Sequence, residues 1–165
     1  VPSPPIKIYF LNRNDIISVE RGSGELPSDY IQRAEYLLLQ AFGRNPAGST
    51  PAREAIQASL NRNIGMKVMR YFLGDGVPNG GAAACKQISD TIMHRPAPED
   101  NPFTFMSCTN QDDQVEWMKT TEEKASYCAE FDDYLDESRE VLKDQGKAFP
   151  YSFGLHLVAQ IVTTF

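Results

Sequence analysis

The sequence predicts a single helix-rich α+β domain over residues 1–165, with a small antiparallel sheet. The length suits one domain, since domains commonly hold roughly 100–200 residues. Hydrophobic residues make up 41% of the chain and charged residues 23%, which is typical of a globular protein with its own core. Short runs of β-forming residues and longer stretches of helical apolar spacing predict that both kinds of element are present.

Three strands are expected, and two of them pair with each other. Residues 6–11 alternate and are rich in β-formers, and residues 16–19 follow after a polar turn, so these segments predict two joined strands. Residues 103–108 predict a further strand by alternation and β-propensity. The proline-rich residues 1–5 predict an extended arm, because proline cannot join a central strand.

Helices are expected where apolar residues recur at helical spacing. These segments are residues 28–42, 50–64, 82–93 and 121–146. Ser28 and Thr50 stand at the N-cap positions of the first two. The long last helix would carry Tyr127, Phe131 and Leu135 on one side and a row of acids on the other.

Two segments fit either a helix or a strand. Residues 64–73 could continue the preceding helix or form a strand of their own. Residues 151–165 hold apolar side chains at helical spacing, yet residues 161–164 favour a strand. The glycine-rich residues 74–81 predict a connecting loop, since no Gly-Lys-Ser/Thr follows them as in a phosphate-binding loop.

Negative charge is concentrated in the last third of the chain. The formal net charge is −6, but residues 1–110 hold 10 acids and 11 bases, while residues 111–165 hold 12 acids and 5 bases. The acidic balance argues against a nucleic-acid partner, because phosphate binding draws on clustered positive charge. No apolar run reaches the roughly 18–20 residues that span a bilayer, so no membrane span is expected.

The cysteines and the first residues bear on the compartment. An odd count of 3 cysteines allows one disulfide and a free thiol, or three free thiols. The chain starts without Met, which fits either a mature end after signal cleavage or a cut chain. We favour a secreted protein with one bridge, and three buried thiols in a cytosolic protein are the alternative.

Few residues suggest chemistry. His94 lies at an expected helix end, where a cation is favourable, and His156 lies in an apolar run typical of a hydrogen-bonded core histidine. The cysteine and histidine spacings match no compact zinc pattern, and the acidic pairs lack the EF-hand spacing. We therefore expect neither a metal nor another cofactor.

Residues 57–165 resemble a known family in their order of elements. Phe105-Met106-Ser107-Cys108 ends a strand, Ser126-Tyr127-Cys128-Ala129-Glu130-Phe131 follows, and the last element contains His156. This layout is similar to that of deuterolysin-type secreted zinc peptidases and the related fungal zinc-binding antigens. In that family a His-Glu-x-x-His helix would follow these segments.

The chain departs from that family at the residues that carry its activity. His156 matches the first zinc ligand, but Leu157 stands at the general base and Gln160 at the second ligand. Zinc hydrolysis needs three protein ligands and a base, so the resemblance implies a non-catalytic relative. A shorter resemblance, in residues 8–10, 37–39 and 159–162, is to the GerM-type domain of bacterial envelope proteins, and it ranks below the first.

We expect at most one disulfide, with Cys108–Cys128 preferred and Cys85–Cys108 as the alternative. A bridge closing such a loop would stabilise the fold by roughly 3 kcal/mol.

The expected function is recognition without catalysis. A secreted domain would bind a protein or other macromolecule, basic in character, through its acidic helix. The binding residues would be Glu130, Asp133, Glu137 and Glu140. The alternative is a hydrolase whose site is assembled from distant segments around His156, Cys128 and Asp133.

Overall fold

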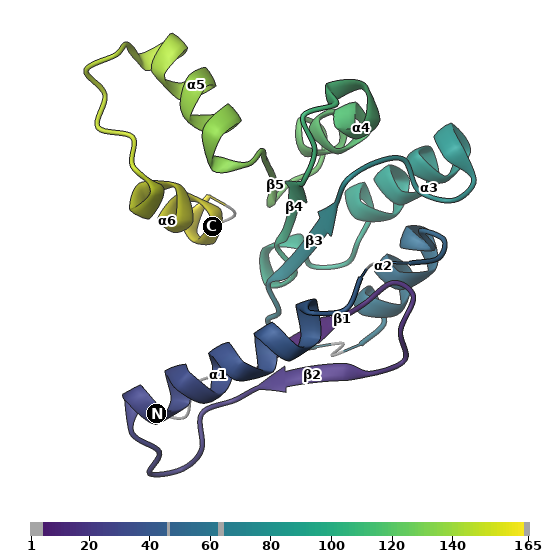
Figure 1. Cartoon of the computed structure of the whole chain (residues 1–165). Coiled ribbons are helices and arrows are strands. Elements are labelled where there is room, and N and C mark those ends of the chain that lie inside the picture. The colour runs from purple at the N-terminus through teal and green to yellow at the C-terminus, as the bar shows by residue number, and fades with distance from the viewer. Residues whose placement is uncertain (1–4, 46, 63–64, 164–165) are drawn as a thin grey trace. The chain divides into compact units, whose positions relative to one another are not determined.

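The computed structural model describes residues 5–45, 47–62 and 65–163 (Figure 1). Its contacts divide the chain into two compact units, residues 1–51 and 52–165. The first unit holds β1 (Ile6–Tyr9), β2 (Ile16–Val19) and α1 (Pro27–Phe42). The second holds α2 (Ala52–Leu60), β3 (Arg70–Gly74), α3 (Gly81–Met93), β4 (Phe103–Ser107), α4 (Asp112–Glu122), β5 (Cys128–Phe131), α5 (Tyr134–Gln145) and α6 (Phe153–Val162), with a 3₁₀ turn at Pro98–Asp100. The predicted α+β class is confirmed.

The first unit is a hairpin and one helix. β1 and β2 pair antiparallel, with Ile6 opposite Val19, as the alternation of residues 6–11 predicted. Helix α1 begins at Pro27, one residue before the predicted cap, because proline suits the first turn of a helix. Val19 and Ala41 are buried between these elements.

The second unit is built on a parallel sheet of order β3-β4-β5, which the sequence did not predict. Helices α3 and α4 connect the strands and lie on one side of the sheet, and α6 lies on the other (Figure 1). Phe72 and Phe105 meet Trp117 of α4 on the first side, while Phe131 meets His156 of α6 on the second. Side chains alternate along each strand, so Glu130 faces α4 and its neighbour Phe131 faces α6.

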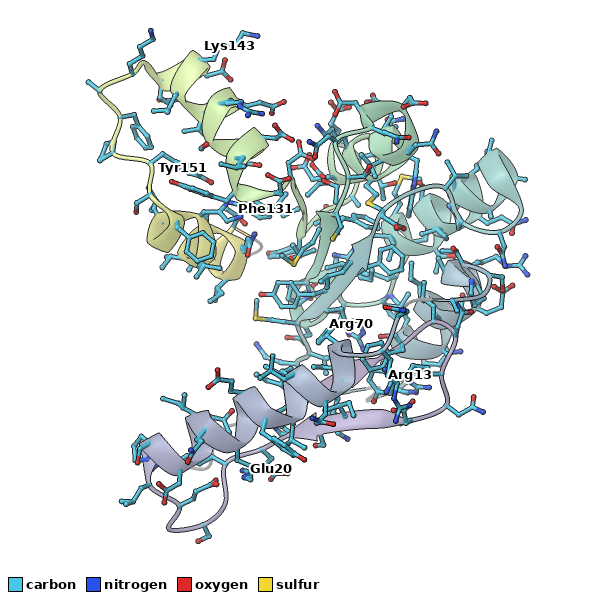
Figure 2. The ribbon with its side chains drawn as sticks, in the orientation of Figure 1. Arg13, Glu20, Arg70, Phe131, Lys143 and Tyr151 are labelled. Carbon is cyan, nitrogen blue, oxygen red and sulfur yellow. The ribbon has the colours of Figure 1, made fainter. Side chains whose placement is uncertain are left out.

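Two buried arginines close the amino-terminal edge of this sheet. Arg95 donates to the carbonyl oxygens of Ile92, Ser126 and Tyr127 at 2.6–2.8 Å. Arg70, labelled in Figure 2, donates to the side chain of Asn101 at 2.7 Å. Because these arginines already bond the carbonyl and amide groups of the amino-terminal edge, a ligand site is expected at the carboxyl-terminal edge.

The predicted helix over residues 121–146 is wrong. Its first part forms the end of α4, a turn and the strand β5, and only residues from Tyr134 onward form the helix α5. Tyr127, Phe131 and Leu135 are four residues apart by coincidence, since Phe131 belongs to a strand and Leu135 to a helix. Residues 128–131 form a strand because they pair with β4. The spacing of apolar residues within a segment does not reveal pairing with a strand that is distant in the sequence.

The two ambiguous segments now have definite structures. Residues 70–74 form the strand β3, and residues 153–162 form the helix α6. The other expected helices and the strand at residues 103–108 are present with shifts of a few residues at their ends. Most of the predicted arm of residues 1–5, the expected helical residue Ile64 and the end of the 151–165 segment lie outside the described residues.

The expected disulfide is not formed: Cys85, Cys108 and Cys128 are free thiols. The parallel sheet explains why the preferred pair is apart. Cys128 lies beside Phe103 at the start of β4, whereas Cys108 follows the end of that strand. Five residues of strand separate the cysteines by about 16 Å, far beyond the roughly 4.4–6.8 Å between Cα atoms that a disulfide allows.

Among the described residues, no helix combines the length and apolar character needed to cross a membrane.

Candidate functional site

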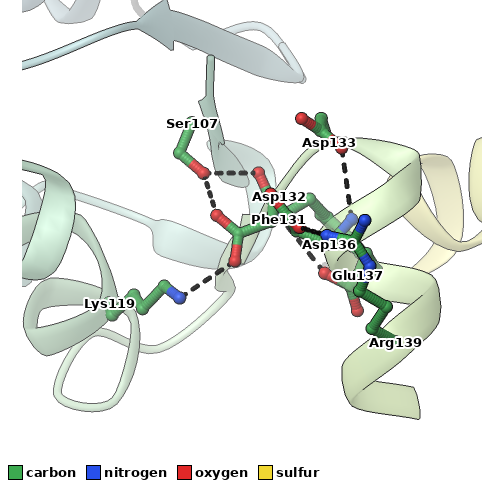
Figure 3. A network of polar contacts seen from close by, with 8 residues as sticks. All are labelled: Ser107, Lys119, Phe131, Asp132, Asp133, Asp136, Glu137 and Arg139. Carbon is green, nitrogen blue, oxygen red and sulfur yellow. Dashed lines mark hydrogen bonds and ion pairs between the residues drawn. The ribbon is translucent and has the colours of Figure 1, made fainter. Parts of the chain in front are cut away.

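The carboxyl-terminal edge of the parallel sheet carries a network of polar side chains (Figure 3). Ligands of open parallel sheets bind at this edge, where the strand ends leave backbone groups and loops unpaired. Ser107 ends β4, and Asp132 and Asp133 follow β5. The Ser107 hydroxyl donates to the carbonyl oxygen of Phe131 at 3.2 Å and lies against a carboxylate oxygen of Asp132.

Lys119 of α4 and Asp132 form a largely buried ion pair at this edge. The Lys119 ammonium donates to Asp132 Oδ2 at 2.9 Å, and Asp132 is only 8% exposed. Burial alone would lower the pKa of Lys119, but the hydrogen bond and charge of Asp132 outweigh it, so the pKa is raised. Lys119 is therefore held as a cation and cannot serve as a base for the Ser107 hydroxyl.

Glu130 is the most perturbed carboxyl group of the site. It lies under α4, and its Oε1 atom is buried with no hydrogen-bond partner among the described residues. Burial raises the pKa of Glu130 to about 7, opposed by the neighbouring Ser107 hydroxyl and the charge of Lys119. Its carboxyl group thus faces the interior more than the surface, although the sequence placed it on an exposed helix.

Asp133 and Glu137 organise the start of α5. Asp133 Oδ1 accepts from the backbone N–H groups of Leu135 at 2.8 Å and Asp136 at 3.2 Å, which makes it the N-cap. Glu137 Oε2 accepts from the backbone N–H of Asp132 at 3.4 Å, and burial raises the pKa of Glu137. Of the four predicted binding residues, Asp133 and Glu137 thus accept backbone hydrogen bonds within the fold, and Glu130 is largely buried.

Exposed carboxylates surround this edge on α4, the turn after β5 and α5. They are Asp112, Asp113, Glu116, Asp133, Glu140 and Asp144. Two basic side chains of the region already form ion pairs within the domain, Lys119 with Asp132 and Arg139 with Asp136. Lys143 is exposed among these acids, and the surface keeps a negative excess.

His156 lies apart from this edge, in an aromatic cluster that joins α5 to α6. It is 3% exposed, and its Nδ1 and Nε2 atoms lie 3.0 Å from the Tyr151 hydroxyl and 2.8 Å from the Gln160 side chain. Phe131 and Tyr151, both labelled in Figure 2, pack edge-on against its ring. Burial lowers the pKa of His156, partly offset by the charge of Asp133, so the ring is a neutral core residue as its apolar surroundings predicted.

The three residues proposed for a hydrolase do not share one site. Both ring nitrogens of His156 have partners other than Cys128 and Asp133. Burial raises the pKa of the Cys128 thiol to about 12, and the thiol is a poor nucleophile while protonated. His94 at the end of α3 bonds the Asp90 carbonyl oxygen at 2.7 Å, in keeping with its predicted place at a helix end.

Within the part of the chain that the structure describes, no three His, Cys, Asp or Glu residues lie together in a way that could hold a metal ion.

The network of Ser107, Lys119 and Asp132 was missed by the sequence analysis. Lys119 belongs to α4, a helix that was not predicted, and the three residues come from separate elements. One feature of the sequence points to this edge: Asp132-Asp133 directly follow residues 128–131, which could form a strand. Polar residues at the ends of strands often line a site.

Comparison with known proteins assigns this chain to no family. No family model, curated protein or solved structure matches the chain. The resemblance to deuterolysin-type peptidases stays a prediction from the sequence.

Proposed function

We propose that this protein is a non-catalytic recognition domain that binds a basic macromolecular partner through an acidic surface. We define the acidic surface as Asp133, Glu140 and Asp144, together with the partly buried Glu137. The observation that carries the proposal is the excess of exposed carboxylates left after Lys119 and Arg139 are paired within the domain. A field of one sign attracts an oppositely charged partner and speeds its encounter.

A hydrolase is the weaker interpretation of the same residues. Catalysis by nucleophilic attack needs an activated side chain and a base within hydrogen-bond reach. Lys119 is held protonated by Asp132, and His156 is enclosed by Tyr151 and Gln160. Secretion, expected from the sequence, is part of the proposal but does not affect its chemistry.

Binding to a glycine-spaced oligolysine peptide tests the proposal. Fluorescence anisotropy of the labelled peptide should report binding that weakens steeply between about 0.1 M and 1 M salt, because exposed charges are screened. The triple variant Asp133→Asn, Glu140→Gln and Asp144→Asn should weaken binding about tenfold, since each exposed ion pair contributes roughly 0.2–1 kcal/mol. The Asp133→Asn change keeps a side-chain oxygen that can cap α5, so the fold is retained.

A matched variant removes charge elsewhere. The triple variant Glu20→Gln, Asp29→Asn and Glu35→Gln neutralises three exposed acids of the first unit and should leave binding nearly unchanged. Peptide binding that is insensitive to salt, or equal losses in the two variants, would contradict the proposal.

A further inference from the structure

Helix α6 has its polar and apolar faces reversed. His156 and Gln160 point into the domain and are 3% and 7% exposed, while Val158 and Ile161 are 52% and 54% exposed. At 100° per residue the outward apolar side chains cover about 200° of the helix circumference. They are Phe153, Leu155, Leu157, Val158, Ile161 and Val162. We call these six residues the α6 face.

The domain's own core does not account for the α6 face. A helix that serves a core turns its apolar residues inward, and α6 turns its two long polar side chains inward instead. The two polar side chains bond each other, and His156 also bonds the Tyr151 hydroxyl. The Tyr71 hydroxyl donates to the backbone carbonyl oxygen of Gln160 at 3.2 Å and ties the helix to β3. The orientation of α6 is thus fixed by hydrogen bonds. Contiguous exposed apolar groups of this kind mark interaction surfaces.

One edge of the α6 face, at Phe153, lies beside the start of α5, directly after Asp133. Tyr134 at the start of α5 packs against Tyr151, Phe153 and His156 at ring-centroid distances of 5.4–6.2 Å. The charges of Asp133 and Glu137 also reach this cluster, acting on His156 and Tyr151 respectively. Residues 153–162 contain no Lys, Arg, Asp or Glu, so the charge bordering the α6 face comes from neighbouring elements.

We propose that the α6 face is the docking site for an amphipathic helix whose apolar stripe is flanked by lysine or arginine. The apolar stripe would cover the α6 face, and the basic flank would meet the acidic surface of α5. This inference rests on the proposed function and specifies its partner. Helices bind in this way through apolar residues at positions i, i+3, i+4 and i+7.

The charge pattern disfavours two other occupants. Interfacial helices that bind anionic membranes carry Lys and Arg beside their apolar face, whereas α5 has acids there. A second copy of the chain would bring two acidic α5 helices toward one another, and like charges in contact are unfavourable. A basic helix satisfies both the apolar and the charged parts of the surface.

A pair of synthetic peptides tests the inference. One contains leucine and lysine with leucine at i, i+3, i+4 and i+7, and the other has the same composition with leucine spread around the helix. We expect the patterned peptide to bind the full chain at least tenfold more tightly than the scrambled one, by fluorescence anisotropy. The double variant Leu157→Gln/Ile161→Gln should abolish that difference, and Val158→Gln/Val162→Gln is a second, independent variant of the same surface.

The control variant removes exposed apolar side chains from a different helix. Ile31 and Leu39 of α1 are 62% and 65% exposed, and Ile31→Gln/Leu39→Gln should leave the preference for the patterned peptide intact. All variants must keep the wild-type circular dichroism spectrum, so that a loss of binding is not a loss of fold. If one of the two α6 double variants unfolds, the other decides the outcome. If both unfold, the double variant Glu140→Lys/Asp144→Lys is used instead, and an unchanged preference for the patterned peptide overturns the inference.

The remaining outcomes separate the inference from the proposed function. Equal binding of both peptides together with salt-sensitive oligolysine binding overturns the docking site and leaves the acidic surface intact. Failure of all three peptides to bind overturns both. Self-association through the α6 face in sedimentation, or binding to phosphatidylserine vesicles in place of the patterned peptide, also overturns the inference.

Discussion

Glu130 is the residue at which burial and charge conflict most directly. The β5 pairing turns its side chain under α4, and burial raises its pKa to about 7 from the ordinary value of 4.5. A group whose pKa is higher in the folded state favours folding while protonated, so its contribution is present below about pH 4.5 and is lost as the pH rises to about 7. Glu130→Gln should therefore stabilise the protein by about 1–2 kcal/mol at pH 8, a value reduced to allow for the remaining solvent exposure.

Urea unfolding of wild type and variant at each pH checks this prediction. The stabilisation by Glu130→Gln should shrink toward zero at pH 4.5. His156 has a lowered pKa, so its own contribution falls as the pH drops below about 6.5, but it is the same in both proteins. A difference that is independent of pH would assign the effect of Glu130 to packing alone.

The three cysteines should differ sharply in reactivity. Cys85 is buried, and burial raises the pKa of Cys128 to about 12. Partial burial of the thiol and the charge of Asp75 also raise the pKa of Cys108, but Cys108 is the exposed cysteine of the three. We expect Ellman's reagent at pH 8 to modify one thiol quickly in the native protein and all three after denaturation. Cys108→Ser should remove the fast phase, whereas Cys85→Ser should keep it. A fast phase that survives Cys108→Ser would place the accessible thiol elsewhere.

At the level of elements, local patterns predicted what local interactions decide. The β1–β2 hairpin, α1 and α3 have their own turn and spacing signals, and all were predicted from the sequence. The parallel pairing of β3, β4 and β5 joins segments more than twenty residues apart, and no local pattern encodes it. The same limit explains why the acidic residues of the candidate site were found while its Ser107–Asp132–Lys119 network was not.

Helix α5 should depend on its cap more than on a packed face. None of its residues is fully buried, and Asp133 is the side-chain acceptor described for the N–H groups of its first turn. Asp133→Ala should destabilise α5 by about 1 kcal/mol, because two N–H groups lose their acceptor, while Asp133→Asn should cost much less. Hydrogen exchange of the amides of α5 measures this difference. Equal protection in both variants would show that packing around Tyr134 holds the helix without the cap.

At the scale of the whole molecule, the buried apolar side chains are unevenly divided between the two units. Val19 and Ala41 are the buried apolar residues described in the first unit, whereas the rest of the core extends from Ala52 onward around Phe103 and Phe105. Trp117, the single tryptophan, packs on Phe72 and Phe105 and reports on the second core.

This distribution predicts that residues 52–165 fold without the first unit, while residues 1–51 do not fold alone. A chain of about 50 residues buries too little surface to offset its conformational entropy unless its core is dense. Thermal unfolding followed by Trp117 fluorescence should therefore remain cooperative when residues 1–51 are removed. A shorter chain of residues 81–165, which lacks β3, provides the control and should lose the transition, because β4 would have a free edge where β3 pairs. Loss of cooperativity in the 52–165 chain would mean that the first unit contributes to the second core, and the two units would then fold as one.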